Sequence, residues 1–195
     1  MSVRERLRER PTLIVPVGTT EQHGPHLPLG CDTLIVERLA DDLSAAFAIP
    51  RAPAVEYGAQ SPAHAFPGGA ALRRKTLHRV MNELIESWEH GADVTEFIIL
   101  TAQAHDPHLE ALSTIRTDGA TVLVADVFAL DFGALLETPG PPTQGGELDT
   151  SLLLYLAPEL VHLELALGAE RSSAQKGERL YRFIFERVSR CLIRR

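Results

Sequence analysis

The chain has 195 residues, a length that fits one globular domain and is too short for two domains of ordinary size. Apolar residues make up 45% and charged residues 23%, which excludes a disordered, collagen-like or coiled-coil chain. The formal net charge of −7 repels phosphate backbones, so no nucleic-acid partner is expected. Two cysteines, Cys31 and Cys191, cannot build a disulfide framework, and no apolar run reaches the length that crosses a bilayer. We therefore expect a single domain over residues 1–195, in the cytoplasm and without a membrane partner.

Short apolar runs predict buried strands, and apolar residues at helical spacing predict the helices between them. The strands are expected at 13–17, 96–100 and 121–127, with a weaker candidate at 52–55. The helices are expected at 33–47, 76–90, 107–117, 149–156 and 173–192. Gly91 is expected to end the second helix, and Ser172 with Gln175 to cap the last one. This alternation predicts an α/β fold with three α/β/α layers and a mostly parallel sheet.

Two stretches rich in glycine and proline, 56–69 and 131–146, resist regular structure. Their composition fits ordered loops over a site and solvent-facing connectors equally well. In open parallel sheets, sites form outside the carboxyl ends of the strands. Polar residues that follow a strand are therefore the first candidates for function.

The densest polar cluster follows the first predicted strand. Glu21, His23 and Asp32 supply two carboxylates and one imidazole, a donor set that suits zinc, manganese or iron(II). Glu21 and His23 are two residues apart, so in extended backbone both side chains point to the same face. Asp32 precedes a predicted helix, where an N-terminal cap is the alternative role. Cys31 beside it is expected to be a small buried residue.

Two further clusters follow later elements. His105 and Asp106 come just after the strand at 96–100, and parallel strands open on one edge, so His105 can approach the first cluster. His108, one helical turn on, is expected on an exposed surface. Glu147 and Asp149 open a predicted helix, where the helix dipole favours carboxylates without any catalytic role.

These segments resemble the creatininase (creatinine amidohydrolase) family over nearly the whole chain. The most specific match is Glu21-Gln22-His23-Gly24-Pro25-His26-Leu27-Pro28-Leu29-Gly30 followed by Asp32-Thr33. Other similar segments are Tyr57-Gly58 with His64 and Phe66-Pro67-Gly68, the strand at 97–100 with its loop, Gly146-Glu147-Leu148-Asp149-Thr150-Ser151, and the closing stretch at 172–178.

The resemblance implies an α/β/α fold, a homo-oligomer that is usually a hexamer, and hydrolysis of cyclic or linear amides of small molecules. It also implies one or two divalent metals per subunit, zinc, manganese or iron, with Glu21, His23 and Asp32 as ligands. The chain departs from the family at its histidines. Gln103 takes the place of the strand-end histidine, Gln144 takes the place of another, and His105 lies two residues after Gln103.

From these departures we expect His105 to complete the metal ligands, and Gln103, His64 and Gln144 to contact substrate. Glu147 or Asp106 would accept a proton from the attacking water. The segment that resembles the family's substrate strand lacks both hydroxyl side chains, which argues against creatinine itself. The alternative is a catalytically impaired member that acts as a binding or structural subunit, and metal content would separate the two.

Overall fold

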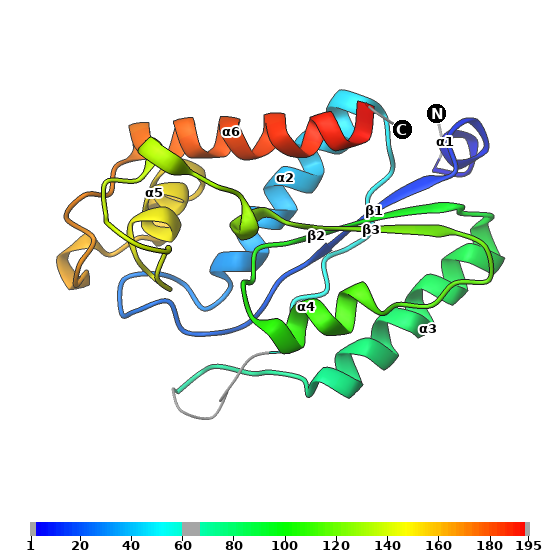
Figure 1. Cartoon of the computed structure of the whole chain (residues 1–195), viewed down its shortest axis with the longest axis horizontal. Helices are drawn as coiled ribbons and strands as arrows, with labels where there is room; N and C mark the ends of the chain where they lie inside the picture. Colours follow the sequence, from blue (N-terminus) through cyan, green and yellow to red (C-terminus); the bar gives the residue numbers. More distant parts are fainter. Residues whose placement is uncertain (1–2, 60–66, 194–195) are drawn as a thin grey trace.

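A parallel sheet forms the centre of the computed structural model, which describes residues 3–59 and 67–193 (Figure 1). The strands are β1 (Thr12–Val17), β2 (Glu96–Thr101) and β3 (Thr121–Asp126), in the order β1-β2-β3. Parallel bridges from Ile14 to Arg51 and from Val17 to Val55 add residues 51–55 beside β1. The three stronger strand predictions are therefore confirmed within one or two residues, whereas the weaker candidate at 52–55 is an extended segment with isolated bridges rather than a strand.

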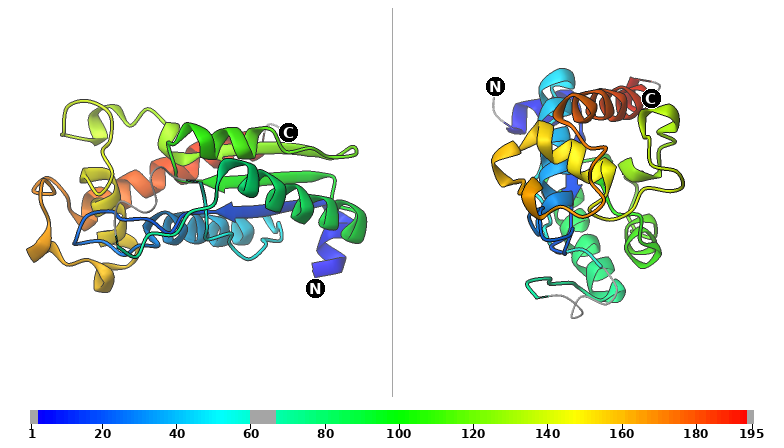
Figure 2. Two further views of the ribbon diagram at one scale, coloured as in Figure 1. Left: turned by 90° about the horizontal axis from the view of Figure 1, so that it is seen from below. Right: turned by 90° about the vertical axis from the view of Figure 1, so that its left-hand side faces the viewer.

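Strand side chains alternate between two apolar cores. Ile14, Ile98 and Leu100 belong to one core, whereas Leu13, Val15 and Phe97 belong to the other. The first core lies under α2 (Cys31–Phe47), α5 (Glu147–Leu156) and α6 (Ala174–Ile193). The second lies under α3 (Arg74–Ala92) and α4 (Asp106–Ser113), with α1 (Val3–Glu9) at its margin. Helices thus cover both faces (Figures 1 and 2), and the predicted α/β/α arrangement is confirmed.

Helix ends differ from the prediction in ways that matter later. Helix α2 begins at Cys31, so Gly30 is its N-cap and Asp32 lies inside the first turn. Helix α3 continues past Gly91 to Ala92, and its C-cap residue Asp93 has a left-handed φ of 55°. Helix α6 is capped by Ser173, not Ser172, because the Ser173 Oγ accepts a hydrogen bond from the Lys176 backbone N–H at 3.2 Å. Helix α1 was not predicted.

Connections at the carboxyl ends of the strands hold short 3-10 turns. These are η2 (Val127–Ala129), η3 (Gly133–Leu135), η4 (Pro158–Leu160) and η5 (Leu163–Leu165). Together with α5 they lie beyond the strand ends, at one end of the molecule (Figure 2). Among the described residues, no helix is both long and apolar enough to cross a membrane.

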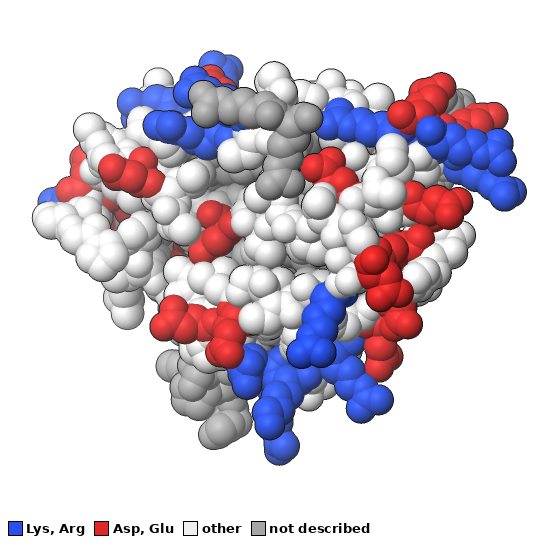
Figure 3. Space-filling view, turned by 45° about the vertical axis from the view of Figure 1, so that its right-hand side comes forward, with Lys and Arg blue, Asp and Glu red and all other residues white. Residues whose placement is uncertain are grey.

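Charged side chains of both signs share the surface. On the face in Figure 3, basic groups lie in several separate places with acidic groups among them. The described residues of this face therefore form no continuous basic surface of the kind that binds a phosphate backbone.

The contact between α5 and α6 is very close at Gly177. A Cβ added there would lie 1.8 Å from the backbone oxygen of Ser151. Only a residue without a side chain allows the two helices to approach this far. This contact matters for the site because α5 carries residues that line it.

We predict that Gly177→Ala lowers the free energy of unfolding by about 2–4 kcal/mol, because the helices must separate. The matched control is Gly91→Ala in α3, where an added Cβ meets open space. That variant should gain about 0.5–1 kcal/mol from helix propensity. Chemical denaturation measures both, and equal effects of the two substitutions would contradict the packing argument.

Candidate active site

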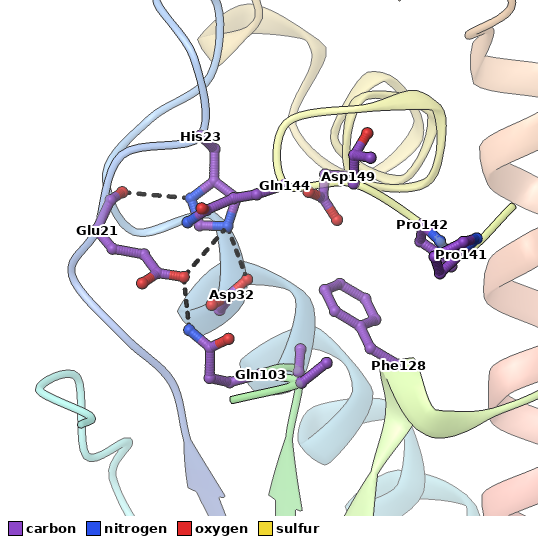
Figure 4. Close-up of a pocket in the computed structure, with 12 residues that line it drawn as sticks. Glu21, His23, Asp32, Gln103, Phe128, Pro141, Pro142, Gln144 and Asp149 are labelled. Carbon is purple, nitrogen blue, oxygen red and sulfur yellow. Dashed lines mark hydrogen bonds and ion pairs between the residues drawn. The ribbon is translucent and has the colours of Figure 1, made fainter. Parts of the chain in front are cut away.

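A cavity of ≈ 320 Å³ opens at the carboxyl edge of the sheet. Three segments that are distant in the sequence meet there: the loop after β1, the end of β2, and the loop that leads into α5 (Figure 4). The lining residues are Glu21, His23, Asp32, Ala102, Gln103, Ala104, Phe128, Pro141, Pro142, Thr143, Gln144 and Asp149. The structure therefore brings the cluster after β1 together with Gln103 from the end of β2 and Asp149 from α5.

The imidazole of His23 is the centre of the polar wall. Its Nε2 lies 3.0 Å from Asp32 Oδ1 and 3.9 Å from Glu21 Oε1. All three side chains are at least nine-tenths buried, and Figure 4 shows them converging on one point. The geometry brings Glu21, His23 and Asp32 together, and their role as metal ligands stays a prediction.

Asp32 is not a helix cap. Its Oδ1 faces His23, while its Oδ2 accepts a hydrogen bond from the Thr19 hydroxyl at 2.6 Å. Because α2 begins one residue before Asp32, the carboxylate projects from the first turn into the site. Thr19, which the sequence analysis did not single out, fixes this orientation.

Gln103 and Gln144 both line the cavity, and their contact with substrate stays a prediction. The Gln103 side-chain amide donates a hydrogen bond to Glu21 Oε1 at 2.5 Å. Gln144 is exposed at the rim, where its Oε1 accepts a hydrogen bond from Gln22 Nε2 at 3.5 Å. His64, the third expected substrate residue, lies outside the described residues.

Asp149, rather than Glu147, reaches the cavity from α5. The helix begins at Glu147, and two positions along a helix differ by about 200° around its axis, so the two carboxylates face opposite ways. Glu147 forms an ion pair with Lys176 and accepts backbone hydrogen bonds from Glu137 and Thr138. Glu147 therefore stabilises the neighbouring loop and does not line the cavity.

Gly145 holds the Asp149 carboxylate in place. Its backbone N–H donates to Asp149 Oδ2 at 2.7 Å, and its φ of +68° is left-handed. A Cβ at this position would lie 2.4 Å from the backbone oxygen of His23. Glycine therefore allows the loop before α5 to pack directly against the loop that carries His23.

The structure does not bring His105 or Asp106 into the cavity. The extended chain after β2 delivers Gln103 to the site and then turns into α4, where His105 is the N-cap and Asp106 is an exposed first-turn residue. Neither His105 nor Asp106 is among the described residues that line the cavity. Of the expected ligands, the lining residues include Glu21, His23 and Asp32 but not His105.

Asp126, another residue that the sequence analysis missed, orders the apolar wall. Its Oδ1 accepts a hydrogen bond from the Phe128 backbone N–H at 3.0 Å, and the Phe128 ring lines the cavity. Burial raises the pKa of Asp126. Strand β3 thereby contributes a fixed aromatic surface opposite the polar wall (Figure 4).

The polar wall concentrates negative charge in a buried place. Burial and the neighbouring Asp32 raise the pKa of Glu21 to about 7, and the same two causes raise the pKa of Asp149 to about 7. Burial alone would lower the pKa of His23, but Asp32, Asp149 and Glu21 raise it to about 9. Without a bound cation, the cluster therefore holds extra protons.

His108 is buried, contrary to the expectation of an exposed residue. Its Nδ1 accepts a hydrogen bond from the Ala59 backbone N–H at 3.2 Å, so its protonated Nε2 donates to the Thr101 hydroxyl at 2.9 Å. It thus joins the segment after Val55 to the end of β2. Burial lowers the pKa of His108 to about 4.

This low pKa predicts a pH-dependent stability. The unfolded chain, with an ordinary pKa of 6.5, takes up a proton before the folded chain does, so stability is lost as pH falls below that value. Between about pH 7 and about pH 5, wild type should lose about 2 kcal/mol more than His108→Gln. His90→Gln, at an exposed histidine, is the control and should follow wild type. Urea titrations at both pH values measure this, and parallel losses in wild type and His108→Gln would contradict it.

Fold and site together define an α/β protein with a buried carboxylate–imidazole cluster at the carboxyl edge of a parallel sheet. A family model described as creatinine amidohydrolase matches residues 1–190, and the chain belongs to this creatininase family. The resemblance inferred from the sequence motifs is therefore confirmed.

Individual relatives carry the names of different hydrolytic activities. A mycofactocin precursor peptide peptidase of Mycolicibacterium smegmatis is 32% identical over 156 residues, which cover 76% of this chain and 59% of that protein. A 3-dehydro-scyllo-inosose hydrolase of Thermotoga maritima is 28% identical over 186 residues, covering 86% of this chain and 57% of that protein. The chain thus spans less than two thirds of these relatives. A solved manganese form of creatininase matches the fold with a TM-score of 0.84 at 19% identity, covering 97% of this chain and 93% of the other.

Proposed function

We propose that this chain is a metal-dependent hydrolase that cleaves an amide C–N bond of a small molecule, with a divalent metal held by Glu21, His23 and Asp32. The observation that supports this most strongly is the buried cluster itself. It places three carboxylates, counting Asp149, around one imidazole at a single cavity. Buried charges of one sign need a counter-charge, and the described lining residues include no lysine or arginine.

Two separations between donor atoms are compatible with a shared divalent metal. Ligands at about 2.0–2.2 Å from a metal lie about 3.0–3.6 Å from one another, and the separations of 3.0 and 3.9 Å around His23 Nε2 are close to this range. Solved relatives of the same fold include a manganese form and a Zn-Zn type. A bound metal would lower the pKa of water and polarise a carbonyl oxygen. We propose one or two ions per chain, a number that elemental analysis gives directly.

The remaining groups have distinct roles in this proposal. Asp149 lines the cavity with one oxygen fixed by Gly145, so its carboxyl group can take a proton from the attacking water and return it to the leaving nitrogen. This is the role that the sequence suggested for Glu147 or Asp106. The side-chain amides of Gln103 and Gln144 can pair with the amide group of a substrate.

The cavity favours a small, uncharged or cationic amide. A volume of ≈ 320 Å³ lies near the lower end of ligand sites, and Phe128, Pro141 and Pro142 form an apolar wall that suits a flat group. Carboxylates on the other wall repel an anionic substrate. One relative is named for a peptide substrate and another for an inosose. The substrate panel for this chain should therefore cover more than one chemical class.

A binding or structural subunit is the competing proposal. Gln103 and Gln144, where family histidines are expected, provide weaker donors and would lower metal affinity. Protein purified without chelator distinguishes the two functions, since a subunit without chemistry would carry well under one metal ion per chain. Assembly into a homo-oligomer stays a prediction from the family resemblance.

We predict that His23→Ala loses the metal and hydrolysis together, because it removes the only imidazole among the described lining residues. His105→Ala should keep its metal, since His105 does not line the cavity, and His162→Ala at an exposed histidine is the neutral control. Elemental analysis measures the metal, and a panel of small amides, formamides and short peptides measures turnover. Metal retained in His23→Ala but lost in His105→Ala would contradict the site.

Gln103→His provides the opposite change. An imidazole beside Glu21 should raise zinc affinity by at least about tenfold, because a nitrogen donor replaces a weak amide. Gln175→His on the exposed face of α6 is the matched control and should leave the affinity unchanged. Competition with a chromophoric chelator reports the dissociation constants. An unchanged affinity in Gln103→His would show that the end of β2 does not face the metal.

A further inference from the structure

The thiol of Cys31 lies directly beside the proposed metal ligands. Cys31 is the first residue of α2 and is completely buried. Its Sγ, a ring nitrogen of His23 and a carboxylate oxygen of Asp32 all lie within 4.8 Å of one another. Consecutive positions in the first helical turn therefore present a sulfur and an oxygen to the imidazole that the preceding loop supplies.

These three atoms can share one metal with little movement. Thiolate sulfur binds zinc at about 2.3 Å and imidazole nitrogen at about 2.0 Å, so tetrahedral ligands lie about 3.5 Å apart. Separations of at most 4.8 Å would therefore shorten by up to about 1.3 Å when the metal binds. Cys191 is also a free cysteine, but it is exposed on α6, so Cys31 is not part of a disulfide.

The thiol would add a strong donor to a site in which His23 is otherwise the only one among the described lining residues. His23 is the only imidazole among the described lining residues, and Gln103 provides an amide that already donates to Glu21. A thiolate would replace the missing strong donor and favour soft metals over hard ones. The alternative role is apolar packing, because Cys31 also belongs to the core that contains Leu27 and Ile35.

We propose that Cys31 Sγ is a thiolate ligand of the metal, together with His23 and Asp32, and that it makes the site prefer zinc or cobalt to manganese. This inference rests on the proposed metal site and adds a ligand to it. On binding, the thiol releases its proton to solvent and a sulfur–metal bond forms, with no change in oxidation state. Glu21, whose Oε1 lies 3.9 Å from His23 Nε2, and Asp149 both still line the cavity as oxygen donors or proton acceptors.

Cobalt(II) titration of chelator-treated protein tests this directly. Wild type and Cys191→Ser should both develop a near-ultraviolet thiolate-to-cobalt charge-transfer band that saturates with bound metal. Cys31→Ser should lose this band, keep the visible d–d bands, and bind cobalt at least about tenfold more weakly. Circular dichroism confirms the fold of each variant, and if Cys31→Ser does not fold, the spectra of wild type and Cys191→Ser still decide.

The outcomes separate the two proposals. Visible cobalt bands in wild type without the charge-transfer band would overturn the Cys31 ligand and leave the metal site standing. A charge-transfer band that persists in Cys31→Ser would also overturn it. Failure of wild type to bind cobalt or zinc at all would overturn the metal site itself, and the Cys31 ligand with it.

Discussion

Burial of several carboxylates around one imidazole is the constraint on which the functional account depends. A buried carboxylate is costly unless a charge or hydrogen bonds compensate it. Here the His23 ring faces Asp32 and Glu21, while Thr19, Gln103 and Gly145 each satisfy only one carboxylate oxygen. The raised pKa values of Glu21 and Asp149 show that part of the buried negative charge has no compensating partner. A dication would neutralise it, and for this reason the cluster is interpreted as a metal site.

The fold creates this cluster by directing three chain segments to one edge. Parallel pairing brings the ends of β1 and β2 side by side, with Val17 opposite Thr101. Helix α2 begins directly at the site and presents Asp32 from its first turn, while α5 presents Asp149 from the opposite side. Close packing at Gly177 and Gly145 sets the position of α5. Stability and function therefore depend on the same contacts.

Much of this arrangement could be predicted from the sequence. Apolar runs located the strands, and the short spacing of Glu21, His23 and Asp32 was enough to place them together. The position of His105 could not be predicted, because it depends on where the chain turns from β2 into α4. The choice of Glu147 over Asp149 was wrong for a similar reason. Both lie in the first turn of α5 but point in different directions, and the packing of the helix decides which one lines the cavity. Buried roles for His108 and Asp126 depend on tertiary contacts with no local signal.

Membership of the creatininase family sets the expectation of hydrolysis, and the departures of this chain make its site distinctive. Glutamines stand at two positions where the family resemblance implies histidines, and a buried cysteine adjoins Asp32. The central claim is that a divalent metal binds between His23 and Asp32. Anomalous diffraction at the zinc absorption edge, from crystals of protein grown with zinc, tests it most directly. The account predicts a peak within about 2.0–2.3 Å of a His23 nitrogen and an Asp32 oxygen; a map with no peak in this cavity would contradict it.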